Sequence, residues 1–152
     1  MDLVLQHFES GVLTLTLNRV DKKNSLTSAM YAELAQALAS AEADAQTKVV
    51  LIQGHETVFS AGNDIADFLQ QPAAGEDSPV FRFLRGMAVF TKPLIASVCG
   101  PAVGVGTTLL LHCDLVYAGD NAAFSMPFVN LGLCPEAGSR SRLPSVSRSQ
   151  GR

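Results

Sequence analysis

The 152-residue sequence has no tryptophan, only three cysteines and no long uninterrupted apolar run. The cysteines form no C-x-x-C pair, so we expect no zinc or dithiol redox site and a reducing compartment. The first residues show neither a secretory signal nor an Arg-rich transit peptide. The most apolar stretch, near residues 94–117, is interrupted by glycine, proline, histidine and aspartate, which argues against a membrane span. We therefore expect a cytoplasmic protein with no membrane partner and no metal.

Clustered positive charge is also lacking over most of the chain. The formal charge is −3, yet residues 139–152 carry four arginines and no acid, which leaves −7 on the residues before them. Residues 1–138 therefore form no basic surface that could bind the phosphates of a nucleic acid, and no nucleic-acid partner is expected. We predict a core domain over residues 1–138 and a disordered or truncated Ser/Arg-rich end over 139–152. A Ser/Arg-type binding tail is the alternative for that end.

The hydrophobic pattern predicts an α/β domain. Leucine and threonine alternate at residues 13–17, as in a half-buried strand, and helical spacing begins near Thr27. The run at residues 49–52 is continuously apolar, which is typical of a strand buried on both faces. The expected order is strands at 3–8 and 13–17, a helix from 27 to about 41, a strand at 49–52, helices at 64–70 and 81–90, a strand at 94–98, a helix at 106–112 and a strand at 115–118.

Two loops of small residues follow buried strands, where α/β sheets commonly bind ligands. The first is FSAGNDI at residues 59–65, and the second is CGPAVGVG at residues 99–106. The second loop leads into a helix whose first N–H groups have no intrahelical acceptor, which favours negative charge there. A dinucleotide site is not expected, because the G-x-G-x-x-G pattern ends on Leu109 instead of a third glycine.

Together with three other short segments, these loops resemble the crotonase (enoyl-CoA hydratase/isomerase) superfamily. The segments are KKNSL at 22–26, FSAGNDI at 59–65, IASVCGPAVGVG at 95–106, CDL at 113–115 and AF at 123–124. The resemblance covers about residues 3–138. It implies an α/β, crotonase-like spiral of repeated ββα units, of which the C-terminal helical region is missing here. It also implies a homotrimer or hexamer for a full-length form.

In that family, two backbone N–H groups bind the thioester oxygen of an acyl-CoA and stabilise an enolate. By motif position, the resemblance assigns these two catalytic donors to Ala61 and Val105. Further substrate contacts are implied at Asn24, Ser25, Leu26, Gly62, Asp64, Ile65, Gly104 and Phe128. Asp64 is expected to cap or hold its loop rather than transfer protons. Coenzyme A is part of the substrate, and no separate cofactor is expected.

Carboxylates decide between hydration and isomerisation in this family. Hydratases carry two glutamates at positions that match Thr108 and Phe128, and neither residue present here can act as a base near neutral pH. Residues 126–138 instead resemble the Δ3,Δ2-enoyl-CoA isomerases, which implies that Glu136 is the proton shuttle. Apolar neighbours would raise the pKa of that glutamate toward neutrality, as a shuttle requires. We therefore predict conversion of 3-enoyl-CoA to 2-enoyl-CoA.

Alternatives from other classes stay open. The chain could be a non-catalytic module that binds acyl-CoA or a protein partner and retains the two loops without turnover. It could also catalyse hydration or another enolate reaction on the same scaffold, such as dehalogenation, decarboxylation or ring opening.

Overall fold

The computed structural model describes residues 2–70, 75 and 77–127. The elements are β1 (Val4–Glu9), β2 (Val12–Leu17), η1 (Val20–Lys22), α1 (Ser28–Ala43), β3 (Val49–Gln53), α2 (Ile65–Gln70), α3 (Pro79–Val89), β4 (Leu94–Val98), β5 (Pro101–Val103), α4 (Val105–Thr108), η2 (Leu109–His112), β6 (Leu115–Ala118) and β7 (Ala123–Ser125). β1–β2–α1 and β4–β5–α4 each have the strand–strand–helix order that we expected. The predicted boundary at residues 138 and 139 lies outside the described residues.

Five of the strands form one sheet in the order β1-β2-β3-β4-β6. β1 and β2 pair antiparallel as a hairpin, whereas β2, β3, β4 and β6 run parallel. β5 and β7 form a separate two-stranded sheet. Because parallel strands end at the same edge, the loops that follow β2, β3 and β4 leave the sheet side by side. This edge contains both loops that the sequence singled out.

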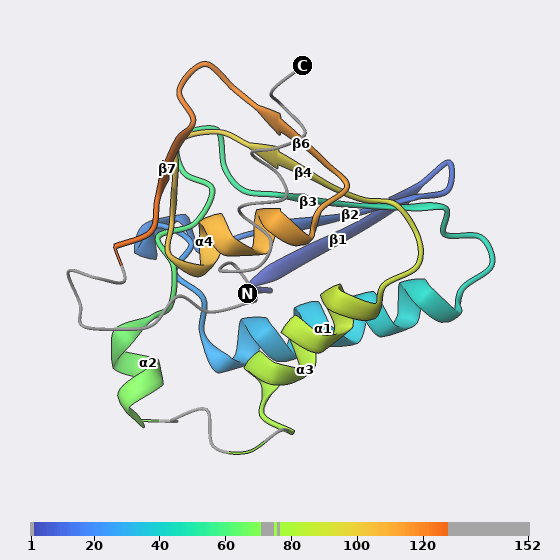
Figure 1. The fold of residues 1–152 in the computed structure, drawn as a ribbon, viewed down its shortest axis with the longest axis horizontal. Coiled ribbons are helices and arrows are strands. Elements are labelled where there is room, and N and C mark those ends of the chain that lie inside the picture. Colours follow the sequence, from blue (N-terminus) through green and yellow to red (C-terminus); the bar gives the residue numbers. More distant parts are fainter. Residues whose placement is uncertain (1, 71–74, 76, 128–152) are drawn as a thin grey trace.

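Helices α1 and α3 lie next to one another along one face of the sheet (Figure 1). Ser78 caps α3, and Pro79 occupies its first turn, where a missing N–H costs no hydrogen bond. The rings of Tyr31 on α1 and Phe83 on α3 meet with their centroids 5.7 Å apart. These helices bury the sheet residues that face them, among which are Leu15, Ile52 and Ala96.

Two predictions of secondary structure need correction. Val50 and Ile52 of β3 are buried but Val49 and Leu51 are only half-buried, so the prediction of a strand buried on both faces is wrong. Helices α1 and α3 cover only one face of the sheet. The helix predicted at residues 106–112 is a four-residue α-helix followed by a 3₁₀ turn. No helix within the described ranges is long and apolar enough to cross a membrane.

Replacement of Phe83 tests the packing of α3 on α1. Phe83 is fully buried, so Phe83→Ala should lower the free energy of unfolding by about 3–5 kcal/mol through the cavity it leaves. Phe81 lies on the same helix but is 46% exposed, and Phe81→Ala should cost less than about 1 kcal/mol. Denaturant unfolding of both variants gives the comparison, and equal losses would contradict this account of the core.

Candidate functional site

The loops after β3 and β4 lie against each other at the carboxyl edge of the sheet. Ser60 pairs with Ala102 of β5 in a parallel bridge. The Ser60 N–H donates to the Pro101 carbonyl at 3.1 Å, and the Val103 N–H donates to the Ser60 carbonyl at 2.8 Å. The loop after β3 is therefore fixed to the segment that leads into α4.

The loop after β2 closes on the opposite side of the same segment. The Leu26 N–H donates to the Gly62 carbonyl at 2.7 Å, and the Asp64 N–H donates to the Leu26 carbonyl at 2.9 Å. Gly62 has a φ of 93°, and a β-carbon there would lie 2.9 Å from the Val103 carbonyl oxygen. Residues 60–64 thus lie between the β2 loop and β5, at a place where only glycine fits at position 62.

Val105 is the first residue of α4, and its N–H has no intrahelical acceptor. Gly104, the residue before it, has a φ of 57°, and its carbonyl accepts the N–H groups of Thr107 and Thr108 at 3.0 Å each. No oxygen atom of the described residues accepts the Val105 N–H. A helix start with such a donor suits a ligand oxygen that gains negative charge. Val105 remains a candidate donor.

The prediction that the Ala61 N–H binds substrate is wrong. This N–H donates to the Lys23 carbonyl at 2.9 Å, so it is already used within the protein. Lys23 and Asn24 both have positive φ values, 53° and 52°, and this left-handed turn directs the carbonyl toward Ala61. A motif position cannot reveal such a bond.

Asn63 follows Gly62 in the same loop, and the sequence reasoning assigned it no role. Leu26 pairs with Asn63 in a parallel bridge and bonds the residues on either side of it. The Tyr31 hydroxyl donates to the Asn63 side-chain oxygen at 2.5 Å and orients the residue from the core.

Asn24, at which the resemblance implied a substrate contact, is buried and hydrogen-bonded within the protein. Asn24 is 0% exposed, and its amide oxygen accepts the Arg19 N–H at 2.8 Å. Its amide nitrogen donates to the Phe59 carbonyl at 3.2 Å. Leu26 packs in the hydrophobic core, and the Ser25 hydroxyl donates to Asp64 at 3.3 Å. This segment holds the donor loop in place from within the protein.

Asp64 holds its loop, as we expected from the sequence. Its carboxylate accepts the Asp67 N–H at 3.0 Å, which caps the start of α2, and it pairs with the Arg19 guanidinium at 2.7 Å. The bond from the Asp67 N–H, followed by the bond from Arg19, lowers the pKa of Asp64 below its ordinary value. The carboxylate is therefore ionised at neutral pH and suited to fixing the loop.

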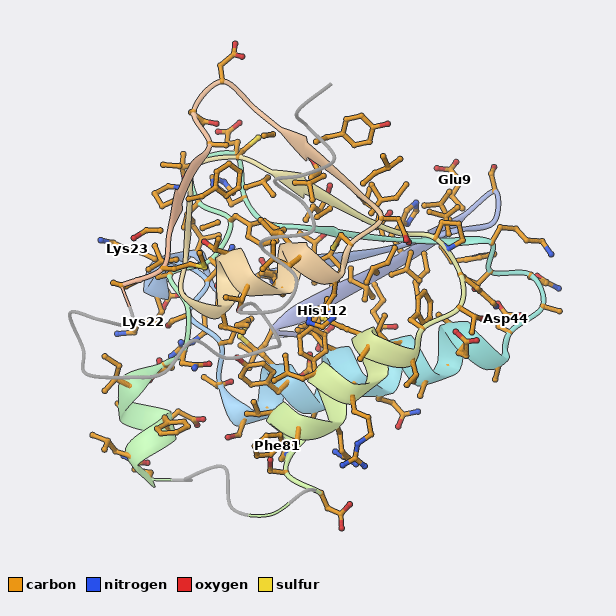
Figure 2. All side chains as sticks on the ribbon, viewed as in Figure 1. Glu9, Lys22, Lys23, Asp44, Phe81 and His112 are labelled. Carbon is orange, nitrogen blue, oxygen red and sulfur yellow. The ribbon has the colours of Figure 1, made fainter. Side chains whose placement is uncertain are left out.

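Other predicted site residues lie around this edge. Ile65 is exposed at the start of α2, and Phe68 and Leu69 on the same helix are exposed as well. Thr108 is fully buried, and its hydroxyl donates to the Val105 carbonyl at 3.5 Å. Figure 2 shows Lys22 and Lys23 on the side of the molecule where α2 and β7 lie, and both are exposed. Phe128 and Glu136 lie outside the described residues.

The lowered pKa of Asp64 predicts a pH-dependent contribution to stability. A carboxylate whose pKa is depressed by folding adds stability above its unfolded pKa of about 3.9, and this stability is lost as the pH falls through the folded value. Asp64→Asn should therefore lower the unfolding midpoint at pH 7, and the difference from wild type should shrink below about pH 4. Chemical unfolding at several pH values measures this. The exposed Asp120→Asn is the control, and an equal effect of both variants at pH 7 would contradict the role of Asp64.

Known proteins resemble this chain over nearly its whole length. Residues 7–148 match the family described as enoyl-CoA hydratase/isomerase. The chain is 40% identical over 97% of its length to 1,2-epoxyphenylacetyl-CoA isomerase from Escherichia coli K12. It is 39% identical over 96% of its length to enoyl-CoA delta isomerase 2 from Rattus norvegicus, and 40% identical over 93% to 2,3-dehydroadipyl-CoA hydratase from E. coli K12.

Solved structures show the same fold. The structure of Pseudomonas aeruginosa OdaA superposes with a TM-score of 0.91 at 57% identity, over 95% of this chain and 59% of that one. Enoyl-CoA hydratase/isomerase from Pseudoalteromonas atlantica T6c superposes with a TM-score of 0.90 at 40% identity, over 94% of this chain and 57% of that one. The chain spans 59% of the length of the epoxyphenylacetyl-CoA isomerase, 39% of the delta isomerase 2 and 56% of the dehydroadipyl-CoA hydratase.

Proposed function

The chain belongs to the enoyl-CoA hydratase/isomerase family, and from that premise we propose that it is the thioester-binding part of an enoyl-CoA isomerase. The reaction would stabilise an enolate and move a double bond from position 3 to position 2 of an acyl-CoA. The α/β architecture of the chain is the crotonase-like fold that the sequence predicted.

The observation that carries this proposal is the start of α4 beside the loop after β3. The Val105 N–H has no acceptor within the described residues. Backbone donors suit this chemistry because they cannot lose their proton and are held by the fold before the charge develops. Each is typically worth roughly 10²–10³ in rate.

The residue types near α4 favour isomerisation over hydration. Thr108 is buried with its hydroxyl on the Val105 carbonyl, and a hydroxyl cannot take a proton from water at neutral pH. Position 128 is a phenylalanine. Isomerisation needs only one carboxylate, because the same group can remove a proton and return it two carbons away. Glu136 is our candidate for that group.

The exposed lysines next to the site favour an acyl-CoA over a simple thioester. Lys22 and Lys23 lie on the loop whose Lys23 carbonyl holds Ala61. Coenzyme A carries phosphates, and exposed ammonium groups near the site would attract them.

Removal of the Val105 N–H tests the proposed donor. Proline is tolerated at the first position of a helix, so Val105→Pro removes the donor without breaking an intrahelical bond. Turnover of 3-enoyl-CoA should fall by about 10²–10³. Val105→Ala is the matched control, because it also trims the side chain but keeps the N–H. Steady-state kinetics on the 152-residue chain and on any longer form that contains it give the comparison, and equal rates for the two variants would disprove the donor.

Replacement of Glu136 tests the proton shuttle. Glu136→Gln keeps the shape and removes the base, so isomerase turnover should fall by at least about 10²-fold while affinity for a non-reactive acyl-CoA analogue stays within a few-fold. Glu9→Gln, an exposed change on β1, is the control (Figure 2). An unchanged isomerase rate would exclude Glu136 as the base. A hydratase rate above the isomerase rate in wild type would overturn the isomerase assignment, and binding without turnover would favour the non-catalytic module.

A further inference from the structure

We propose that the outer surface of α1 and α3 is a docking surface for a second copy of this chain, which binds through the same two helices turned antiparallel. The inference goes beyond the proposed function, because no residue of the candidate site takes part in it. It starts from a groove of about 270 Å³ between the two helices. The residues that line this groove belong to α1, to α3 and to Phe90, which directly follows α3.

Small apolar residues occupy much of this groove. Ala35 and Ala39 of α1 line it, and so does Gly86 of α3, where a β-carbon would lie 3.9 Å from the Leu38 side chain. Val89 lines the same groove and is 67% exposed. Small residues allow helices of two molecules to approach each other closely, and an exposed valine beside them gains free energy when it is buried.

The groove has a cation at one end and an anion at the other. α1 and α3 run side by side in the same direction, since the rings of Tyr31 and Phe83 meet in the first half of each helix (Figure 1). At the far end, Glu42 accepts the Thr91 N–H at 3.1 Å, just after α3. Arg82 lies near the start of α3, and Arg82 and Glu42 both line the groove. At a rise of about 1.5 Å per residue, roughly 10 Å of helix separates the two charges.

Both charges are available for a contact between molecules. Within residues 2–70, 75 and 77–127, no carboxylate pairs with the Arg82 guanidinium. The hydrogen bonds from the Thr91 hydroxyl and then its N–H lower the pKa of Glu42, which is therefore ionised at neutral pH. α1 carries Glu33 and Glu42 but no lysine or arginine, whereas α3 carries Arg82 and Arg85 but no acid.

A two-fold axis between two copies, crossing the groove at right angles, brings these opposite charges together. The rotation reverses the direction of the second copy, so that Arg82 of each copy lies at the end of the groove that contains Glu42 of the other. It also sets the helices of one copy antiparallel to those of the other, which makes their dipoles attract. The same surface supplies the groove, the exposed valine and both charges. This self-complementarity favours a second copy over a different partner.

The size of the surface predicts a weak dimer. The 16 residues of α1 and the 11 residues of α3 form helices about 24 Å and 16 Å long, each about 10 Å wide. Together they cover less than the roughly 800 Å² per partner that is usual in stable complexes. We expect a dissociation constant on the order of 10–100 µM, which rises with salt because the two charge contacts are screened.

Sedimentation equilibrium of the 152-residue chain, from about 5 µM to about 0.5 mM, tests the dimer. Ala39 is exposed, so Ala39→Glu leaves the core intact but places a charge in the groove. It should raise the dissociation constant at least about 10-fold. Tyr117→Glu is the matched control, because it adds the same charge at a residue that is 64% exposed on β6, and it should change the constant by less than about 2-fold.

An exchange of charges tests the antiparallel arrangement. Arg82→Glu and Glu42→Arg should each raise the dissociation constant about 10-fold, because each creates two contacts between like charges in a dimer. The double variant should return to within about 3-fold of wild type. Glu42→Arg also loses the bonds from Thr91, so denaturant unfolding must show that it and the double variant are folded.

A wild-type chain that stays monomeric at about 0.5 mM would disprove the dimer. If Tyr117→Glu abolishes association and Ala39→Glu does not, the copies meet at the β6 edge and the proposal is wrong. A folded double variant that associates no better than the single variants would contradict the antiparallel arrangement. These results leave the proposed function untouched, since that is tested by the turnover of Val105→Pro and Glu136→Gln.

Discussion

The hydrogen bonds that join three loops at the carboxyl edge of the sheet hold the candidate site together. The loop after β2 bonds residues 61–64 through Lys23 and Leu26, and β5 bonds Ser60 from the other side. These bonds give partners to backbone groups of all three loops, and a backbone group that is buried without a partner is costly. The parallel strands are the precondition, because they bring the three loops to one edge.

This arrangement explains why small residues occur where they do. A side chain at Gly62 would strike the Val103 carbonyl, and one at Gly106 would strike Ser60. The glycines allow the loop after β3 and the start of α4 to approach each other closely. Close approach is what two backbone donors need if they are to bind one oxygen atom, since a hydrogen bond is effective only near 3 Å.

The sequence predicted the elements well and the details of the site less well. Alternating Leu and Thr over 13–17 identified β2, and helical spacing from Thr27 identified α1, because both patterns depend only on which face is buried. The role of Ala61 was predicted wrongly and the internal hydrogen bonds of Asn24 were not foreseen, because both depend on the left-handed turn at Lys23 and Asn24 that brings the first two loops together. Side-chain type at one position carries no information about a bond between segments more than 30 residues apart. The helix predicted at 106–112 is a 3₁₀ turn from Leu109 onward, and the spacing of apolar residues over so short a segment does not distinguish the two helix types.

Backbone donors and acidic side chains have separate tasks in the chemistry that we propose. The donors depend on the fold alone, so the same loops can stabilise an enolate whatever reaction follows. The reaction depends on which side chains can move protons near that enolate, and a buried threonine at position 108 moves none. The relatives of this chain include proteins named as isomerases and as a hydratase, which is what a shared donor site with exchangeable side chains would produce. In the proposed chemistry the loops would set the class of intermediate, and the residue types at positions 108, 128 and 136 are the reason why we propose isomerisation.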